Sequence, residues 1–173
     1  MSESSAGASD VSRGLVAIAA RSLLFTLVLP GAIAGWVPLA ILGDATLAGA
    51  GPARWLGALP LALGLAVYVW CVADFATQGH GTPAPIDPPQ ELVSRGLYRW
   101  TRNPMYVGVL AVIAGEAWLG ASARLALYGL AVFTGFHLFV LGYEEPTLRR
   151  RFGAAYERYC ARVPRWLPRR PRA

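Results

Sequence analysis

The sequence predicts an all-α membrane protein with about four transmembrane helices and a C-terminal, cytoplasmic amphipathic helix. Hydrophobic residues make up 55% of the 173 positions and charged residues only 15%, whereas a soluble domain has about 25% charged residues. The chain also contains four apolar segments of roughly the length that spans a bilayer, which takes about 20 residues in a helix. We therefore expect a multi-pass protein of the cell membrane.

The first apolar segment covers residues 15–42 and follows an N-terminus, residues 1–12, that is rich in Ser, Gly and Ala. This N-terminus has the composition of a disordered segment. It lacks the basic region of a cleaved signal peptide, so we expect the apolar segment to remain as a span. The segment contains Pro30-Gly31, and either one kinked helix or two short helices would fit it.

Three further apolar segments cover residues 55–75, 104–119 and 125–141. The last two are short, and only residues 120–124 separate them, which predicts a tight helical hairpin. We expect residues 13–76 to form an N-terminal transmembrane region. Residues 77–173 form a second region that consists of a loop, the hairpin and a C-terminal helix.

The distribution of Arg predicts the orientation, because every basic residue of the chain is Arg. Three of them, Arg95, Arg99 and Arg102, lie in the link between the second and third segments, and nine of the 16 follow Glu145. The positive-inside rule then places this link and both termini in the cytoplasm. Such a basic tail contacts anionic lipid headgroups more often than nucleic acid, so we expect membrane lipids and no nucleic acid as partners.

Proline residues mark the ends of the expected elements. The loop of residues 77–103 contains four of them and cannot be helical, while Asn103-Pro104 is typical of an N-cap followed by the first helical residue. Pro146 is expected to open the C-terminal helix and Pro164 to end it. Apolar side chains recur in that helix at steps of three and four residues, which would place it on the membrane surface or against the bundle; they are Leu148, Phe152, Tyr156, Tyr159 and Val163.

Polar residues at one end of the hairpin are the candidates for a functional site. The hairpin would bring Asn103 and Tyr106 close to Glu144 and Glu145, although about forty residues separate them. Two adjacent carboxylates at the end of a span repel each other and have little effect on topology. They indicate either a site or an ion pair with an Arg of the tail.

Metal binding is not expected. Cys71 and Cys160 lie far apart and form no Cys-x-x-Cys motif, and His80 and His137 are widely separated. This pattern matches neither a disulfide framework nor a zinc site.

Three motifs make the chain resemble a family of integral membrane enzymes. They are GLYRWTRNPMYVG at residues 96–108, the pair Glu144-Glu145, and RRRFGAAYERYCARVPRWLP at residues 149–168. With their spacing, they resemble the isoprenylcysteine carboxyl methyltransferase and phospholipid methyltransferase family over residues 81–167. The resemblance implies transfer of a methyl group from S-adenosylmethionine to a small or lipid-like acceptor. The alternative is a non-catalytic membrane scaffold or lipid-binding protein that retains a relic cofactor pocket.

The resemblance also implies which residues contact the cofactor. Carboxylates accept hydrogen bonds from ribose hydroxyls or pair with the ligand's amino group, and Tyr rings suit adenine or a sulfonium cation. The start of a helix offers free backbone N–H groups to a carboxylate. The implied residues are Leu92, Val93, Tyr98, Asn103, Pro104, Met105, Tyr106, Glu144 and Glu145.

Two departures from the family pattern bear on the acceptor. Asn103 replaces the His of the usual Arg-His-Pro motif, so this position cannot transfer protons. Val140 stands where the isoprenylcysteine enzymes carry an Arg suited to hold the substrate carboxylate. We therefore expect a thiol or amine acceptor rather than a carboxylate, although the sequence does not identify the acceptor or the oligomeric state.

His137 is the candidate catalytic residue. It precedes Glu144 by seven residues, which is two helical turns, so both should lie on one face. An ionisable residue within a span is a functional candidate. The alternative is a neutral His that is hydrogen-bonded to a carbonyl of a neighbouring helix.

Overall fold

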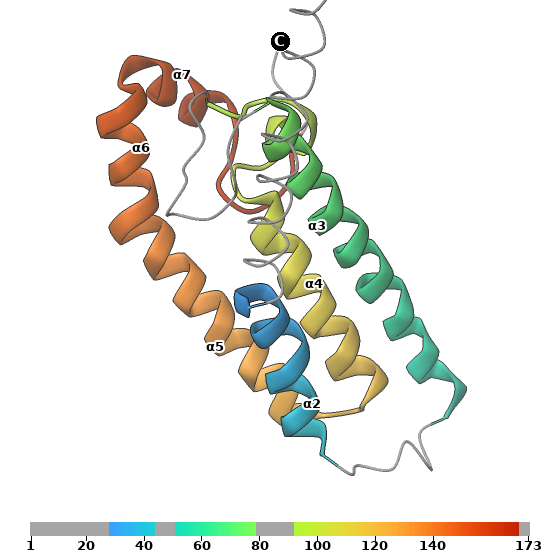
Figure 1. Ribbon diagram of the computed structural model, residues 1–173. Coiled ribbons are helices and arrows are strands. Elements are labelled where there is room, and N and C mark those ends of the chain that lie inside the picture. The colour runs from blue at the N-terminus through green and yellow to red at the C-terminus, as the bar shows by residue number, and fades with distance from the viewer. Residues whose placement is uncertain (1–27, 44–50, 79–91, 170–173) are drawn as a thin grey trace, which may run out of the picture.

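The computed structural model describes residues 28–43, 51–78 and 92–169, and in these ranges the regular elements are all helical (Figure 1). The expected N-terminal disorder, the beginning of the first apolar segment and the four prolines of the loop lie outside the described residues. The prediction of an all-α fold is thus confirmed for the part that the structure describes.

Three helices lie side by side and form the body of the molecule (Figure 1). The first, α3 (Ala58–Gln78), is preceded by the 3₁₀ turn η2 (Pro52–Gly57) and packs along α4 (Pro104–Leu119). The second and third, α4 and α5 (Ala123–Phe139), form the predicted hairpin. The N-terminal helix, which includes α2 (Val37–Leu42), contacts α5.

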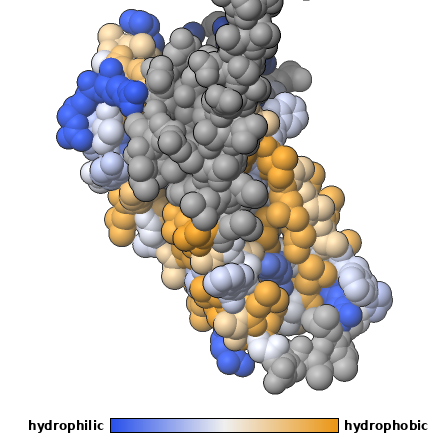
Figure 2. All heavy atoms as spheres, in the orientation of Figure 1, coloured by the Kyte–Doolittle hydropathy of each residue, from blue (hydrophilic) through white to orange (hydrophobic). Residues whose placement is uncertain are grey.

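Two helices are long and apolar enough to cross a membrane. They are Pro52–Phe75 and Ala123–Phe152, and two shorter apolar helices, Val28–Leu42 and Pro104–Leu119, accompany them. Figure 2 shows hydrophobic side chains along α3 and hydrophilic ones gathered near α6 (Glu145–Phe152). The exposed leucines of α3, such as Leu59, Leu63 and Leu65, are suited to contact with lipid tails rather than water.

Glycines let the backbone of α4 approach the backbone of η2 and α3 closely, a contact that the sequence analysis did not predict. A Cβ atom added at Gly64 would lie 2.5 Å from the carbonyl oxygen of Gly108, and one added at Gly57 would lie 2.7 Å from that of Gly115. Both contacts join backbone to backbone, so no side chain can move aside. Small residues permit this close approach of helices in membranes, and the seam fixes α4 against α3.

The turn of the hairpin is short, and the start of α5 within it is capped by a side chain. Ser122 precedes α5, and its Oγ accepts a hydrogen bond from the backbone N–H of Leu125 at 3.2 Å. Ala121 adopts a left-handed conformation with φ of 46°. The chain thereby reverses between Leu119 and Ala123, close to the predicted boundaries.

The helix of the fourth apolar segment extends beyond residue 141. It continues through a π turn, η4 (Val140–Glu144), into α6, so the continuous helix ends at Phe152. Pro146 therefore does not open a new helix. A proline inside a helix clashes with the preceding turn, and a π turn relieves such a clash by widening the turn.

The same arrangement occurs in the N-terminal helix. The π turn η1 (Ala32–Trp36) lies just before Pro38, and Ala34 departs from helical geometry with φ of −112° and ψ of 20°. The described part of the first apolar segment, residues 28–42, is thus one kinked helix, with the kink at Ala34 and not at Pro30 and Gly31. These two residues lie in regular helix, and the distortion lies before the next proline.

The prediction of a single C-terminal helix is also wrong, because this segment forms two helices. Gly153 has a left-handed φ of 50° and separates α6 from α7 (Ala154–Arg162). The periodic apolar side chains pack inward rather than on a membrane surface. Tyr156, Tyr159 and Val163 are buried against Leu92 and Leu148.

Candidate functional site

The hairpin brings the start of α4 beside the end of α5, and a hydrogen bond joins the two. The hydroxyl of Tyr106 donates to Oε2 of Glu144 at 3.0 Å. The ring of Tyr106 also packs on Phe136, with 4.6 Å between ring centroids. The predicted approach of Tyr106 to Glu144 is therefore confirmed.

Glu145 is the centre of a buried ion-pair network. Its carboxylate accepts hydrogen bonds from Arg165 at 2.6 and 3.1 Å, and it lies 3.1 Å from Arg102 and 3.5 Å from Arg149. The residue is only 2% exposed. Because Arg165 belongs to the tail, the predicted alternative of an ion pair with a tail Arg is confirmed for this member of the Glu pair.

Residues 164–169 of the tail run alongside the segment that precedes α4. The backbone N–H of Arg102 donates to the carbonyl of Pro164 at 2.9 Å, and the hydroxyl of Thr101 donates to the carbonyl of Arg165 at 2.9 Å. Asn103 precedes α4 as predicted, but its side chain caps no helix. Its Nδ2 donates instead to the carbonyl of Arg165 at 3.0 Å. These bonds attach the tail to the start of the hairpin.

Tyrosines from the loop and from α7 form one wall of the site. The hydroxyl of Tyr159 donates to the carbonyl of Tyr98 at 2.8 Å, and both rings are buried. Burial, reinforced by the nearby Cys71 thiol, raises the pKa of Tyr98 well above its usual range. Burial likewise raises the pKa of Tyr159. Both hydroxyls thus stay protonated and act as hydrogen-bond donors.

Two adjoining cavities share the wall that Tyr106 and Glu144 form. The tail-side cavity has a volume of about 180 Å³ and reaches Leu148, Phe152 and the α7 tyrosines. The bundle-side cavity has a volume of about 290 Å³ and reaches the N-terminal helix and α3. The residues that line both are Phe75, Tyr98, Arg102, Asn103, Tyr106, Phe139 and Glu144.

The structure gathers most of the residues predicted to contact a cofactor. The tail-side cavity is lined by seven of the nine: Leu92, Val93, Tyr98, Asn103, Tyr106, Glu144 and Glu145. Met105 lines the bundle-side cavity. Pro104 is buried at the first position of α4 and belongs to the lining of neither cavity.

His137 lies outside the lining of both cavities. Its Nδ1 accepts a hydrogen bond from Nε1 of Trp166 at 3.1 Å, and its ring stacks near Phe133. The predicted alternative for His137 was a hydrogen bond to a carbonyl of a neighbouring helix. The partner that the structure shows is the side chain of Trp166 in the tail. The π turn after His137 changes the helical register, since such a turn holds more residues than an α turn. The catalytic role of His137 stays a prediction.

Arg102 is a charged residue of this site that the sequence analysis did not nominate. It lines both cavities, and its side chain is 11% exposed. Its Nη1 contacts Glu145 and the sulfur of Cys160, whereas its buried Nε has no hydrogen-bond partner among the described residues. An unpaired buried donor is costly. Its place directly before Asn103 in the motif is the sequence signal that points to it.

The comparisons with known proteins agree with this location. The model of the phospholipid methyltransferase family matches residues 52–155, whereas no curated protein and no solved structure matches the chain. The match begins at η2 and so includes α3, which the motif resemblance did not cover. It also includes Tyr106 and Glu144. Because more than half of the chain is matched, this protein belongs to the phospholipid methyltransferase family, and the family indicates a membrane methyltransferase.

Proposed function

We propose that the chain transfers a methyl group from S-adenosylmethionine to a neutral thiol or amine of a small or lipid-like acceptor. The observation that carries this proposal is the pair of Tyr106 and Glu144 on the wall that two cavities share. One ligand can then lie on each side of the pair. Methyl transfer requires such an arrangement, because the two reacting centres must meet in line and away from water.

The polar groups of the tail-side cavity fit the cofactor. S-adenosylmethionine supplies an activated methyl group on a sulfonium centre. The buried Nε of Arg102 has no partner among the described residues and fits a ligand carboxylate. Glu144 fits an amino group or ribose hydroxyls, and aromatic rings suit adenine or the sulfonium. Each cavity is smaller than the roughly 300–1,000 Å³ of a typical ligand pocket, so we expect the cofactor to extend along the shared wall.

Glu145 is proposed to position this site rather than to contact the cofactor. Its carboxylate is already engaged by Arg102, Arg149 and Arg165. By holding Arg102, it places the unpartnered Nε beside the cavities. By holding Arg165, it attaches the tail that supplies the tyrosine wall. Leu92, Val93 and Met105 are proposed to supply apolar contacts.

The bundle-side cavity is proposed to receive the acceptor. Its wall toward the N-terminal helix is apolar, with Leu29, Ile33 and Val109 among the lining residues. Val140, which stands where the isoprenylcysteine enzymes carry an Arg, lines the tail-side cavity and not this one, and Arg102, which lines both, is engaged by Glu145 and by the proposed cofactor carboxylate. A carboxylate would therefore enter at a large desolvation cost. A thiol or amine enters neutral and, on gaining the methyl group, releases a proton that Glu144 is placed to accept.

The proposal includes four membrane spans with both termini in the cytoplasm. The two long helices and two shorter apolar helices provide the four segments. The shorter α4 has 16 residues. It is proposed to cross the membrane because residues suited to the membrane interface lie near both of its ends, Glu116 and Trp118 at one and Asn103 at the other. Residues 77–173 then carry the methyltransferase site. Reporter fusions that place Ala173 outside the cell would contradict this topology.

The acceptor class is tested with purified protein in lipid nanodiscs and S-adenosylmethionine labelled at the methyl group. Three lipid-tailed acceptors with a matched hydrocarbon chain are compared: a prenylcysteine, a thiol and an amine. We expect label in the thiol or the amine product. Efficient methyl-ester formation on the prenylcysteine would contradict the acceptor, and no transfer to any class in a membrane-lipid extract would contradict the enzyme.

A further inference from the structure

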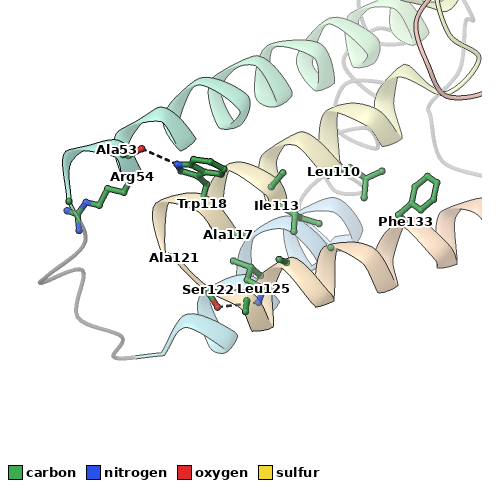
Figure 3. A pocket seen from close by; sticks show the side chains of 15 residues that line it. Ala53, Arg54, Leu110, Ile113, Ala117, Trp118, Ala121, Ser122, Leu125 and Phe133 are labelled. Carbon is green, nitrogen blue, oxygen red and sulfur yellow. Dashed lines mark hydrogen bonds between the residues drawn. The ribbon is translucent and has the colours of Figure 1, made fainter.

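Beside Tyr106, three aromatic rings from α5 and the tail form a cluster: Phe133, His137 and Trp166. None of the three lines either cavity of the proposed site. The ring centroid of Trp166 lies 5.2 Å from that of Phe133, edge to face, and 6.0 Å from that of His137. Phe133 also stands at one end of an apolar groove of about 800 Å³ along α4 and α5 (Figure 3). The cluster therefore adjoins both this groove and the site.

A hydrogen bond fixes the orientation of the Trp166 ring. Its Nε1 donates to Nδ1 of His137 at 3.1 Å. An indole N–H can only donate, so the nitrogen that receives it must carry a lone pair. His137 thus uses Nδ1 as an acceptor and holds its proton on Nε2. Ring packing alone would allow the indole to turn over, whereas this bond selects one orientation.

The backbone beside Trp166 is held in place as well. Arg165 directly precedes it, and Nε of Arg165 donates to Oε1 of Glu145 at 2.6 Å. The carbonyl of Arg165 accepts hydrogen bonds from Thr101 and Asn103 at 2.9 and 3.0 Å. Trp166 is therefore fixed at both ends of its side chain, by its neighbour in the chain and by His137.

Trp166 contacts the residue on which the proposed function depends. Its ring centroid lies 6.5 Å from that of Tyr106, within the range of aromatic pairs, and Phe136 contacts the same ring at 4.6 Å. A Tyr106 ring held by two neighbouring rings keeps its hydroxyl directed at Glu144, to which it donates at 3.0 Å. Small misplacements of reacting groups strongly lower the rate of a transfer between two bound molecules, so the orientation of this ring matters.

We infer that Trp166 is a positioning residue, which, bonded to His137, holds the Tyr106 ring on the wall that the two cavities share. The inference rests on the proposed function of that wall. It makes His137 an anchor for the tail. A proton-transferring His137 would need to reach the reacting atoms, whereas its Nδ1 is engaged by Trp166 and its ring lies outside both cavity linings.

The position of Tyr106 is tested without turnover, by fluorine NMR of the full-length protein in detergent micelles with a fluorotyrosine in place of Tyr106. The decisive pair is His137→Gln and His137→Asn, because both remove the imidazole ring. In Asn, Oδ1 is bonded to Cγ, as Nδ1 of His is, so it accepts the Trp166 N–H at the same point and should preserve one narrow resonance. The amide of Gln lies one bond farther from the backbone, so His137→Gln should broaden or split the resonance.

The same pair is then compared with Trp166→Phe in the methyl-transfer assay. The loss of one hydrogen bond corresponds to about a fivefold change, so kcat should fall by that much in Trp166→Phe and His137→Gln, while the acceptor KM stays unchanged. That split is expected of misalignment in the transition state rather than of weaker binding. His137→Asn should retain most of the turnover. The double variant should be no slower than either single one, because both changes remove the same bond.

Trp118→Phe is the control. Nε1 of Trp118 donates to the carbonyl of Ala53 at 3.0 Å near the other end of α4, so its removal should change neither the resonance nor kcat. An identical fluorine resonance in His137→Gln and His137→Asn would overturn the inference. Equal losses of kcat in these two variants would also overturn it and give His137 a role in proton transfer. If the unmodified protein transfers no methyl group, the proposed function fails, and the fluorine resonances alone decide whether Trp166 positions Tyr106.

Discussion

The two ends of the α4–α5 hairpin have opposite chemistry. At the open end, polar side chains from distant parts of the chain converge: Tyr106 bonds to Glu144, and Glu145 is surrounded by three arginines. At the closed end, small residues leave an apolar groove with one cation at its rim. One pair of helices therefore carries a polar site at one end and an apolar surface at the other.

Within the open end, the two adjacent carboxylates also differ. Glu145 is enclosed by cations and 2% exposed, whereas Glu144 is partly exposed, lines both cavities and has Tyr106 as its hydrogen-bond donor. We therefore expect the stability of the fold to depend on Glu145 and ligand binding to depend on Glu144. The following predictions separate these roles, and they also compare the polar end with the glycine seam.

The largest effect on stability is expected for Glu145→Gln. Removal of this charge leaves Arg102 and Arg165 without their anionic partner in a buried setting, which should lower the free energy of unfolding by about 3–5 kcal/mol. Denaturation in mixed detergent micelles measures it. Glu157→Gln is the control, because Glu157 also pairs with an arginine but is exposed. Equal losses in the two variants would show that burial of Glu145 contributes nothing.

A smaller loss is expected for Gly64→Ala in the seam between α3 and α4. The new methyl group would lie 2.5 Å from the carbonyl of Gly108, and such overpacking lowers the free energy of unfolding by about 1–3 kcal/mol. Gly135→Ala is the control, since nothing lies within 4 Å of its Cβ position. That variant should be neutral or slightly more stable, because Ala favours helix over Gly. A seam variant as stable as the control would refute the close packing of α3 on α4.

The smallest effect on stability is expected for Tyr106→Phe. The ring contact with Phe136 stays, and only the hydrogen bond to Glu144 is lost. The free energy of unfolding should fall by about 1 kcal/mol, measured in the same denaturation assay. In the transfer assay the product yield should fall, because Glu144 is no longer held on the shared wall. Full activity in this variant would remove the Tyr106 hydroxyl from the proposed mechanism.

The sequence was sufficient for the parts of the fold that depend on local patterns. The hairpin and the start of α4 at Pro104 follow from composition and from the position of prolines, and the approach of Tyr106 to Glu144 follows from the hairpin itself. The π turns and the break at Gly153 were not predictable from the same patterns. A regular period of 3.6 residues does not reveal a widened turn, and glycine permits a left-handed conformation without requiring one.

The candidate site was predictable only as far as the motifs reached. Glu145 was nominated with Glu144 because the two are adjacent, yet their neighbours in space differ. Tyr106 of α4 bonds to Glu144, whereas the arginines at Glu145 include Arg102 of the loop and Arg165 of the tail. Arg102 resembled a topology signal until its burial was known. The glycine seam joins residues more than forty positions apart. Such contacts depend on the tertiary arrangement, which periodicity does not contain.

The most direct test of the central claim is isothermal titration of the detergent-solubilised protein with S-adenosylhomocysteine. We predict that the unmodified protein binds it, that Glu144→Gln weakens binding by about 1.5–3 kcal/mol, the scale of a charge-assisted hydrogen bond, and that the exposed control Glu157→Gln binds normally. A folded Glu144→Gln variant that binds as tightly as the control would contradict the placement of the cofactor on the wall formed by Tyr106 and Glu144.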